Sequence, residues 1–359
     1  MTARSAVVQK VKSRRLDIDL VRFIAAVCIV LGHCFLMYVD PACQIYDLFS
    51  EAPAIYRAVD PFAIYWALPV FVSISGYLVM YNASLRDGSF DYLSFVKKKI
   101  IRLYIPGVAF SCFYVVLFSK DLAWTDILRK IFFDGAGHIW FLFMLFYIYL
   151  SAPIIKWGVQ KMGWRAVLPI TFIVSFISCF FPKNSSVLAV FFYHFFFALG
   201  MFFGQRHRDV PVRRTLKGML PWMLGAVMLY VLVFFCLGLI KESSQVKFLA
   251  ASSAKFFQFQ HWGFRLLIGG VMTPIVLSFL PFSVPQKTVL SPLYSLSYKI
   301  YLLHQFILLG VLSLPTWVLS SLYSLSPILF PWALFLLVLS SAVGLSLSLS
   351  KTPFVKRIL

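Results

Sequence analysis

Residues 21–39 read VRFIAAVCIVLGHCFLMYV, an apolar run long enough to cross a lipid bilayer as one helix. Two ionisable side chains, Arg22 and His33, interrupt this run, and such residues inside a membrane span are costly. They are eleven residues apart, close to three helical turns, so both lie on one helix face, about 16 Å apart along the axis. A cation near the cytoplasmic end and a proton acceptor in the outer half of one face predict a substrate path.

The rest of the chain has the same apolar character. Of its 359 residues, 61% are hydrophobic and only 13% are charged, which is typical of a polytopic helical membrane protein. We therefore expect an all-α bundle of about ten transmembrane helices. The predicted spans are 18–38, 60–81, 100–118, 137–154, 167–182, 188–204, 219–240, 262–281, 290–313 and 328–349.

The distribution of basic residues predicts the orientation of this bundle. With the N-terminus inside, the cytoplasmic segments hold 21 Lys and Arg and the outer loops hold 8. This asymmetry favours an even number of spans with both termini in the cytoplasm. It divides the chain into a basic N-terminus (1–17), one membrane domain (18–349) and a basic tail (350–359). The net charge of +20 is spread over alternate loops, which argues against nucleic-acid binding.

Histidines gather in the predicted outer half of the bundle. His33 and His304 lie at similar depth in the first and ninth spans, and His138 begins the fourth span at the outer face. Histidine titrates near neutral pH and can take a proton from a hydroxyl, so these three are candidate catalytic residues. His194 and His261 are expected to make interhelical hydrogen bonds only, and His207 to lie in a cytoplasmic loop.

Basic side chains gather at the predicted cytoplasmic side. The segment KKKIIRLYIP (97–106) opens the third span, and its residues Lys99 and Arg102 are expected to share a helix face that suits a fixed anion such as a phosphate. Asp19 precedes Arg22 by three residues, a spacing at which helical side chains touch. The candidate anion-binding residues are Arg14, Arg15, Lys98, Lys99 and Arg102.

Other patterns favour structural roles. The small residues in FVSISGYLVM (71–80) and LGMFFG (199–204) predict close helix packing. The six cysteines show no metal-binding spacing and are expected to be small buried side chains, with a Cys34–Cys43 disulfide as the alternative. No metal site is expected.

These segments together resemble the acyltransferase 3 family of membrane-embedded acyltransferases, which includes O-acetyltransferases of bacterial surface glycans. The resemblance covers nearly the whole chain and rests on five segments in order: RLDIDLVRFIAAVCIVLGHCF (15–35), LPVFVSISGYLV (68–79), KKKIIRLYIP (97–106), GHIWFLFMLFYIYL (137–150) and SLSYKIYLLHQF (295–306). In the third segment, Lys99 replaces the arginine that often begins the family's Arg-x-x-Arg pattern, so bidentate phosphate geometry is lost there.

The resemblance implies a multi-pass O-acyltransferase in a bacterial cytoplasmic (inner) membrane. The implied donor is cytoplasmic acyl-CoA, most often acetyl-CoA. The implied acceptor is a hydroxyl of a cell-envelope glycan such as lipopolysaccharide O-antigen, or of a lipid-linked sugar. His33 would act as general base or carry the acyl group as an acyl-imidazole. Arg22, supported by Asp19, would stabilise negative charge, and His138 and His304 would orient the acceptor or the oxyanion. A secondary transporter, a glycan flippase and a membrane scaffold are the alternatives.

Overall fold

A computed structural model describes residues 15–36, 56–81, 91–118, 122–181, 185–209, 254–280, 282 and 291–352, with short helical pieces between 221 and 232. Every regular element in these residues is a helix, as expected. The elements are α2 (Leu16–Phe35), α3 (Tyr56–Tyr81), α4 (Tyr92–Lys99), η3 (Ile100–Tyr104), α5 (Ile105–Phe118), α6 (Trp124–Arg129), η4 (Lys130–Asp134), η5 (Gly137–Ile139), α7 (Trp140–Leu150), α8 (Ala152–Met162), α9 (Trp164–Ser178), α10 (Ser186–Asp209), α13 (Ala254–Phe279), α14 (Ser291–Tyr294), α15 (Ser297–Leu312), α16 (Thr316–Leu325) and α17 (Phe330–Leu349).

The predicted spans agree with these helices where both can be compared. Seven helices of the described part are long and apolar enough to cross a membrane. The expected span at 290–313 corresponds to α15, which is followed after a 98° bend by α16. The expected span at 167–182 corresponds to the shorter apolar helix α9. The span at 219–240 lies largely outside the described residues. The structure is therefore a polytopic helical membrane bundle.

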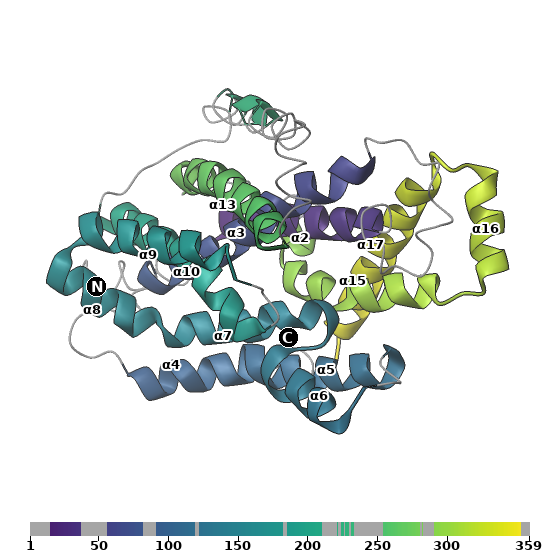
Figure 1. Cartoon of the computed structure of the whole chain (residues 1–359), viewed down its shortest axis with the longest axis horizontal. Coiled ribbons are helices and arrows are strands. Elements are labelled where there is room, and N and C mark those ends of the chain that lie inside the picture. The colour runs from purple at the N-terminus through teal and green to yellow at the C-terminus, as the bar shows by residue number, and fades with distance from the viewer. Residues whose placement is uncertain are drawn as a thin grey trace, which may run out of the picture.

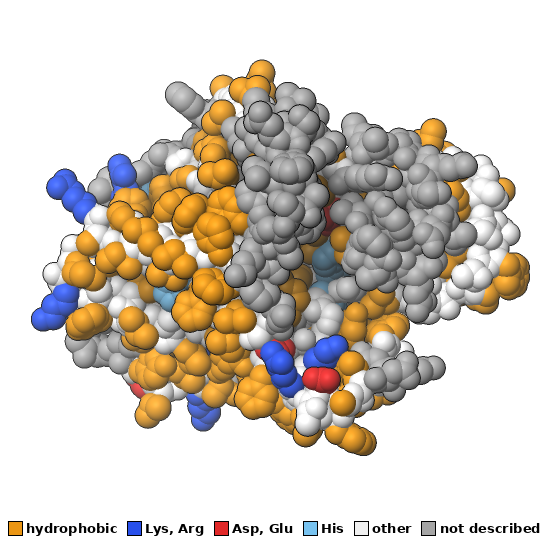
Figure 2. Space-filling model, in the orientation of Figure 1, with side chains coloured by type: hydrophobic (Ala, Val, Ile, Leu, Met, Phe, Trp, Pro, Cys, Tyr) orange, Lys and Arg blue, Asp and Glu red, His pale blue; other side chains and the backbone are white. Residues whose placement is uncertain are grey.

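Helix α3 forms the centre of the bundle. It packs against α10, α2 and α13, and α2 in turn packs against α15 and α17 (Figure 1). Large apolar side chains cover much of the outer surface of the bundle (Figure 2), as expected of helices that face lipid. Buried polar side chains lie instead on the inner helices, among them Asp60 on α3, Arg265 on α13 and His304 on α15.

Glycines allow α3 and α10 to approach closely. A Cβ atom on Gly200 would lie 1.9 Å from the carbonyl oxygen of Ser73, and one on Gly204 would lie 2.3 Å from the carbonyl oxygen of Tyr77. A Cβ on Gly76 would lie 2.1 Å from the carbonyl oxygen of Phe197. The two small-residue segments therefore face each other, which confirms the packing role predicted for them.

Pro106 changes the third span. In a regular α-helix the carbonyl of Arg102 would accept a hydrogen bond from residue 106, and proline has no N–H to donate. The chain forms the π-helical turn η3 just before Pro106, and the hydroxyl of Tyr298 donates to the Arg102 carbonyl at 2.8 Å. This link ties the third span to α15.

Four cysteines are described, and each is a free thiol: Cys28, Cys34, Cys112 and Cys179. Cys34 is buried against apolar neighbours, in agreement with the predicted packing role. Cys43 lies outside the described residues.

Candidate active site

Three of the predicted histidines meet in one cluster. His33 on α2 and His304 on α15 stack with ring centroids 5.1 Å apart, and His33 Nδ1 lies 2.8 Å from His304 Nε2. The ring of His138, in η5, lies edge-on at 5.0 Å from His304. We call these three residues the histidine cluster. Their positions in the chain are far apart, so the fold brings together side chains that the sequence singled out separately.

The hydrogen bonds of the histidine cluster assign its tautomers. His304 Nδ1 lies 2.7 Å from the carbonyl oxygen of Tyr301, which can only accept, so Nδ1 carries the proton. In the neutral ring, His304 Nε2 is then an acceptor, and His33 Nδ1 must be the donor to it. The remaining nitrogen of His33, Nε2, is left with its lone pair. His304 is fully buried, whereas His33 is only half-buried, so His33 is the member of this pair that a substrate can reach.

The backbone around His138 is held in place on α15. The His138 N–H donates to Gln305 Oε1 at 3.0 Å, its carbonyl accepts from the Tyr301 hydroxyl, and its Nε2 donates to the carbonyl of Leu302 at 3.1 Å. Gly137 has a φ of +53°, and a Cβ there would collide with the Tyr114 ring. The glycine before the histidine is therefore required for this turn. The other nitrogen, His138 Nδ1, is buried and has no hydrogen-bond partner among the described residues.

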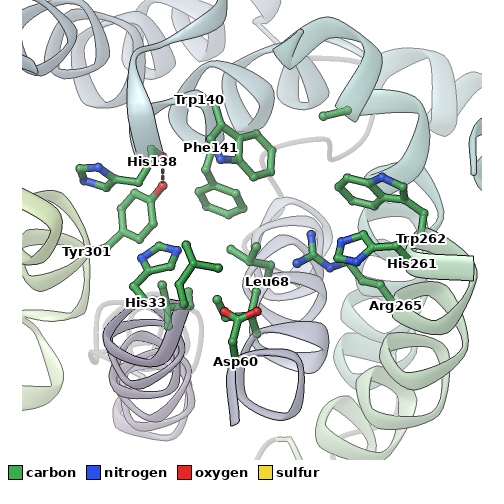
Figure 3. Close-up of a pocket in the computed structure, with 14 residues that line it drawn as sticks. His33, Asp60, Leu68, His138, Trp140, Phe141, His261, Trp262, Arg265 and Tyr301 are labelled. Atoms are coloured by element: carbon green, nitrogen blue, oxygen red, sulfur yellow. Dashed lines mark hydrogen bonds between the residues drawn. The ribbon is translucent and has the colours of Figure 1, made fainter. Parts of the chain in front are cut away.

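A pocket of about 360 Å³ opens beside the histidine cluster (Figure 3), and we call it the outer pocket. Figure 2 shows a histidine and an acidic side chain on this face of the molecule. The outer pocket combines aromatic, apolar and ionisable groups, as substrate sites commonly do. Its lining residues are Ile29, His33, Leu36, Asp60, Ile64, Leu68, His138, Trp140, Phe141, Ala189, His261, Trp262, Arg265 and Tyr301.

Arg265 is a site residue that sequence reasoning missed. Its guanidinium lies 5.1 Å from the Tyr65 ring centre and 4.8 Å from the Trp262 ring centre. Within the described part of the chain, its guanidinium makes one long hydrogen bond, from Nη1 to the Tyr193 hydroxyl at 3.4 Å, and its Nε has no hydrogen-bond partner. The sequence did contain a signal for Arg265, because an arginine inside a predicted transmembrane span is rare.

Asp60 and His261 also line the outer pocket, although the sequence suggested no catalytic role for either. The Tyr65 hydroxyl lies 3.0 Å from His261 Nδ1, so His261 does make the interhelical hydrogen bond that was expected. It nevertheless faces the pocket as well. The outer pocket therefore carries a carboxylate, a guanidinium and three imidazoles.

A second polar group lies about three turns away along α2. Arg22 and Lys99 both lie near Tyr149 of α7: the Lys99 Nζ is 3.5 Å from the Tyr149 ring centre, and Arg22 is within electrostatic range of the same phenol. Ser75 is within hydrogen-bonding range of Tyr149. We call Arg22, Lys99, Tyr149 and Ser75 the inner cation site. Arg22 Nε is buried without a hydrogen-bond partner among the described residues.

The other predicted basic residues lie apart from the inner cation site. Arg102 is exposed, so it does not share the inward face of Lys99, contrary to expectation. The reason is the π-helical turn η3, which places more residues in a turn than an α-helix does. Lys98 is exposed as well, and Arg14 lies outside the described residues.

Arg15 and Asp19 lie at the N-terminal end of α2. Arg15 is held by Asp17 through two hydrogen bonds of 2.9 and 2.6 Å, so its guanidinium already has a carboxylate partner. Asp19 is within electrostatic range of Arg22, as the three-residue spacing predicted. No group of His, Cys, Asp and Glu that could hold a metal ion is present in the described part of the chain.

Comparison with known proteins identifies the family. A family model described as an acyltransferase domain matches residues 15–351, nearly the whole chain. No curated protein and no solved structure matches the chain. The matched range contains the histidine cluster, the outer pocket and the inner cation site. The chain therefore belongs to the acyltransferase 3 family of membrane acyltransferases.

Proposed function

We propose that this membrane acyltransferase moves an acetyl group from cytoplasmic acetyl-CoA to a hydroxyl of a cell-envelope glycan, such as lipopolysaccharide O-antigen. The observation that carries the proposal is the hydrogen bond between His33 and His304. It leaves a lone pair on His33 Nε2 at a residue that lines the outer pocket. A positioned imidazole with a free nitrogen is the group that a hydroxyl acceptor requires as general base.

In the proposed reaction, the proton of the acceptor hydroxyl is transferred through His33 to the leaving thiolate. His33 Nε2 takes the proton of the acceptor hydroxyl while the hydroxyl oxygen attacks the thioester carbonyl carbon. The tetrahedral intermediate collapses, the carbon–sulfur bond breaks, and the proton passes from His33 to the thiolate. The products are an O-acetyl ester and free CoA thiol. His304 acts as a positioning residue, because it holds the tautomer and orientation of His33.

The inner cation site is the proposed binding site for the CoA phosphates. Arg22 and Lys99 place two positive charges near one phenol, and a buried pair of cations is stabilised by an anionic ligand. Arg22 lies about 16 Å from His33 along α2. The pantetheine arm, a chain of about twelve bonds, spans about 14 Å when extended at backbone dimensions. Phosphates held at Arg22 and Lys99 would therefore let the thioester reach His33.

The exposed residues Lys98 and Arg102, together with Arg14 and Arg15, are proposed to attract the polyanionic donor to this end of the bundle. Such steering depends on charge and not on fixed contacts. By the distribution of basic residues, this end faces the cytoplasm of a bacterial cell and the outer pocket faces the opposite compartment. The acceptor glycan and the donor would then reach His33 from opposite sides.

The test is acetyl transfer by the purified protein in liposomes. Acetyl-CoA is supplied on one side with a glycan extract on the other, and free CoA thiol and glycan-bound acetyl are both measured. We expect equal amounts of the two products, and a loss of at least 100-fold in the His33→Ala variant, the usual contribution of a general base. Glycan that crosses the membrane unchanged, with no thiol released, would support the transporter or flippase alternative. Full transfer by His33→Ala would remove His33 from the mechanism.

A further inference from the structure

Arg265 is a buried cation in the wall of the outer pocket, which it shares with the carboxylate of Asp60. Its side chain is largely buried, and the salt bridges found among the described residues, Arg15–Asp17 and Arg129–Asp134, do not include it. Its neighbours are the rings of Tyr65 and Trp262 and the hydroxyl of Tyr193. Aromatic faces stabilise a cation only partly, so a buried guanidinium of this kind is best stabilised by an anion that arrives with a ligand.

The position of Arg265 favours a group of the acceptor over two anions that the reaction itself supplies. The CoA phosphates have their proposed site around Arg22 and Lys99, about three turns of α2 away from the outer pocket. The oxyanion of the tetrahedral intermediate forms beside His33, whereas Arg265 enters the pocket from α13, across from His33 in Figure 3, and acts on His33 through its charge without a hydrogen bond between the two described side chains. The geometry therefore favours an acidic group of the acceptor as the partner of Arg265, at a distance from the hydroxyl that is acylated.

The remaining walls suit a sugar. Trp140 and Trp262 offer large flat faces to the outer pocket, and Asp60 and His261 offer hydrogen-bonding groups. Aromatic rings combined with a few polar groups can hold a molecule that has apolar C–H faces and a hydroxyl rim. A guanidinium adds a planar fork of donors that matches a carboxylate or a phosphate.

We propose that Arg265 makes the outer pocket selective for an acidic acceptor sugar, one that carries a carboxylate or phosphate on the same or the neighbouring ring. This inference rests on the proposed acyltransferase function, and it adds the chemical class of the acceptor. Arg265 is a specificity-determining residue here: it binds a part of the acceptor that does not react.

The first experiment changes the sugar and leaves Arg265 unchanged. Methyl glucuronide is compared with its neutral amide, which has nearly the same shape, in binding and in acetyl transfer. Binding is followed by the fluorescence of the tryptophans, two of which line the pocket, in the His33→Ala protein, so that it is measured without turnover. We expect the acid to bind about 10- to 100-fold more tightly than the amide, the range for a hydrogen bond to a charged group. Glucose 1-phosphate, against methyl glucoside, tests whether phosphate is preferred to carboxylate.

The second experiment uses matched variants. Arg265→Gln should abolish the preference for the acid, and Arg265→Lys should keep part of it. Arg165→Gln is the control, because Arg165 is an exposed arginine on α9, away from the pocket, and it should keep the preference in full. Thermal unfolding of each detergent-solubilised variant verifies that it is folded.

Two results would overturn the proposal. One is equal use of the acid and the amide by the wild-type protein. The other is an Arg265→Gln variant that loses turnover to the same degree with both sugars, which would place Arg265 at the reacting carbonyl. If the acid binds selectively but no acetyl is transferred, the acidic-sugar site stands and the proposed acyltransferase reaction fails.

Discussion

Substitution of His304 by leucine tests the role of the histidine cluster without touching the proposed base. The change removes the acceptor that receives the His33 Nδ1 proton at 2.8 Å. His33 is then free to carry its proton on Nε2, and in that tautomer Nε2, the proposed base, cannot accept the proton of the hydroxyl. Leucine fits a buried apolar site of similar size, so the fold should tolerate the change.

The expected decrease in kcat of His304→Leu follows from the loss of general-base catalysis by His33. General-base catalysis contributes about 100- to 10,000-fold to a reaction, which is about 2.7–5.4 kcal/mol of transition-state stabilisation at 1.36 kcal/mol per factor of ten. We expect kcat of His304→Leu to fall into this range. The KM for acetyl-CoA should stay within about twofold, because the inner cation site lies about three turns away on α2.

The assay is the release of free CoA thiol by purified protein with saturating glycan acceptor. His304→Gln is the matched variant, since a glutamine carbonyl can still accept from His33 Nδ1, and it should retain more activity than His304→Leu. The reasoning is refuted if a folded His304→Leu protein keeps more than about a third of the wild-type kcat. A rise in the donor KM with unchanged kcat would also contradict it.

Three further predictions concern packing and donor binding. Gly200→Leu should prevent α3 and α10 from approaching and lower the melting temperature or abolish membrane accumulation, whereas Gly310→Leu, where a Cβ meets open space, should be tolerated. Lys99→Met should raise the KM for acetyl-CoA at least fivefold, and more than Lys98→Met does, because Lys99 stacks on Tyr149 and Lys98 is exposed. Steady-state kinetics that show equal effects of the two changes would remove Lys99 from the donor site. Tyr298→Phe removes the hydrogen bond to the Arg102 carbonyl, which is exposed, and should cost about 0.5–1.5 kcal/mol of stability; unchanged thermal unfolding would contradict this.

Much of the fold follows from local chemistry. Apolar runs of span length must form helices in lipid, because every backbone polar group has to be paired within the segment, and the predicted spans agree with the helices where both can be compared. The glycine segments were also readable, since small residues at the same helix face permit close packing. Which segments pack together could not be predicted from the sequence: only the structure pairs residues 71–80 with 199–204.

Part of the candidate site could be predicted from the sequence. His33, His138 and His304 stood out because a titratable group inside a membrane needs a reason, and they do lie together. The expectation that Arg102 shares the inward face of Lys99 failed, because the three-residue spacing assumes an α-helix and η3 is π-helical. Arg265 was noticed only as one basic residue among others, since nothing near it in the chain marks it as part of a pocket.

The amino-acid sequence alone therefore indicated the membrane class, the positions of the helices, and the ionisable side chains inside them, whose burial in a membrane is costly. The packed bundle decided which of them act together. His33 and His304 are 271 residues apart, and their hydrogen bond depends on how α2 and α15 rotate against each other. Local sequence carries no information on that rotation, because it is set by the fit of side chains across many helices at once.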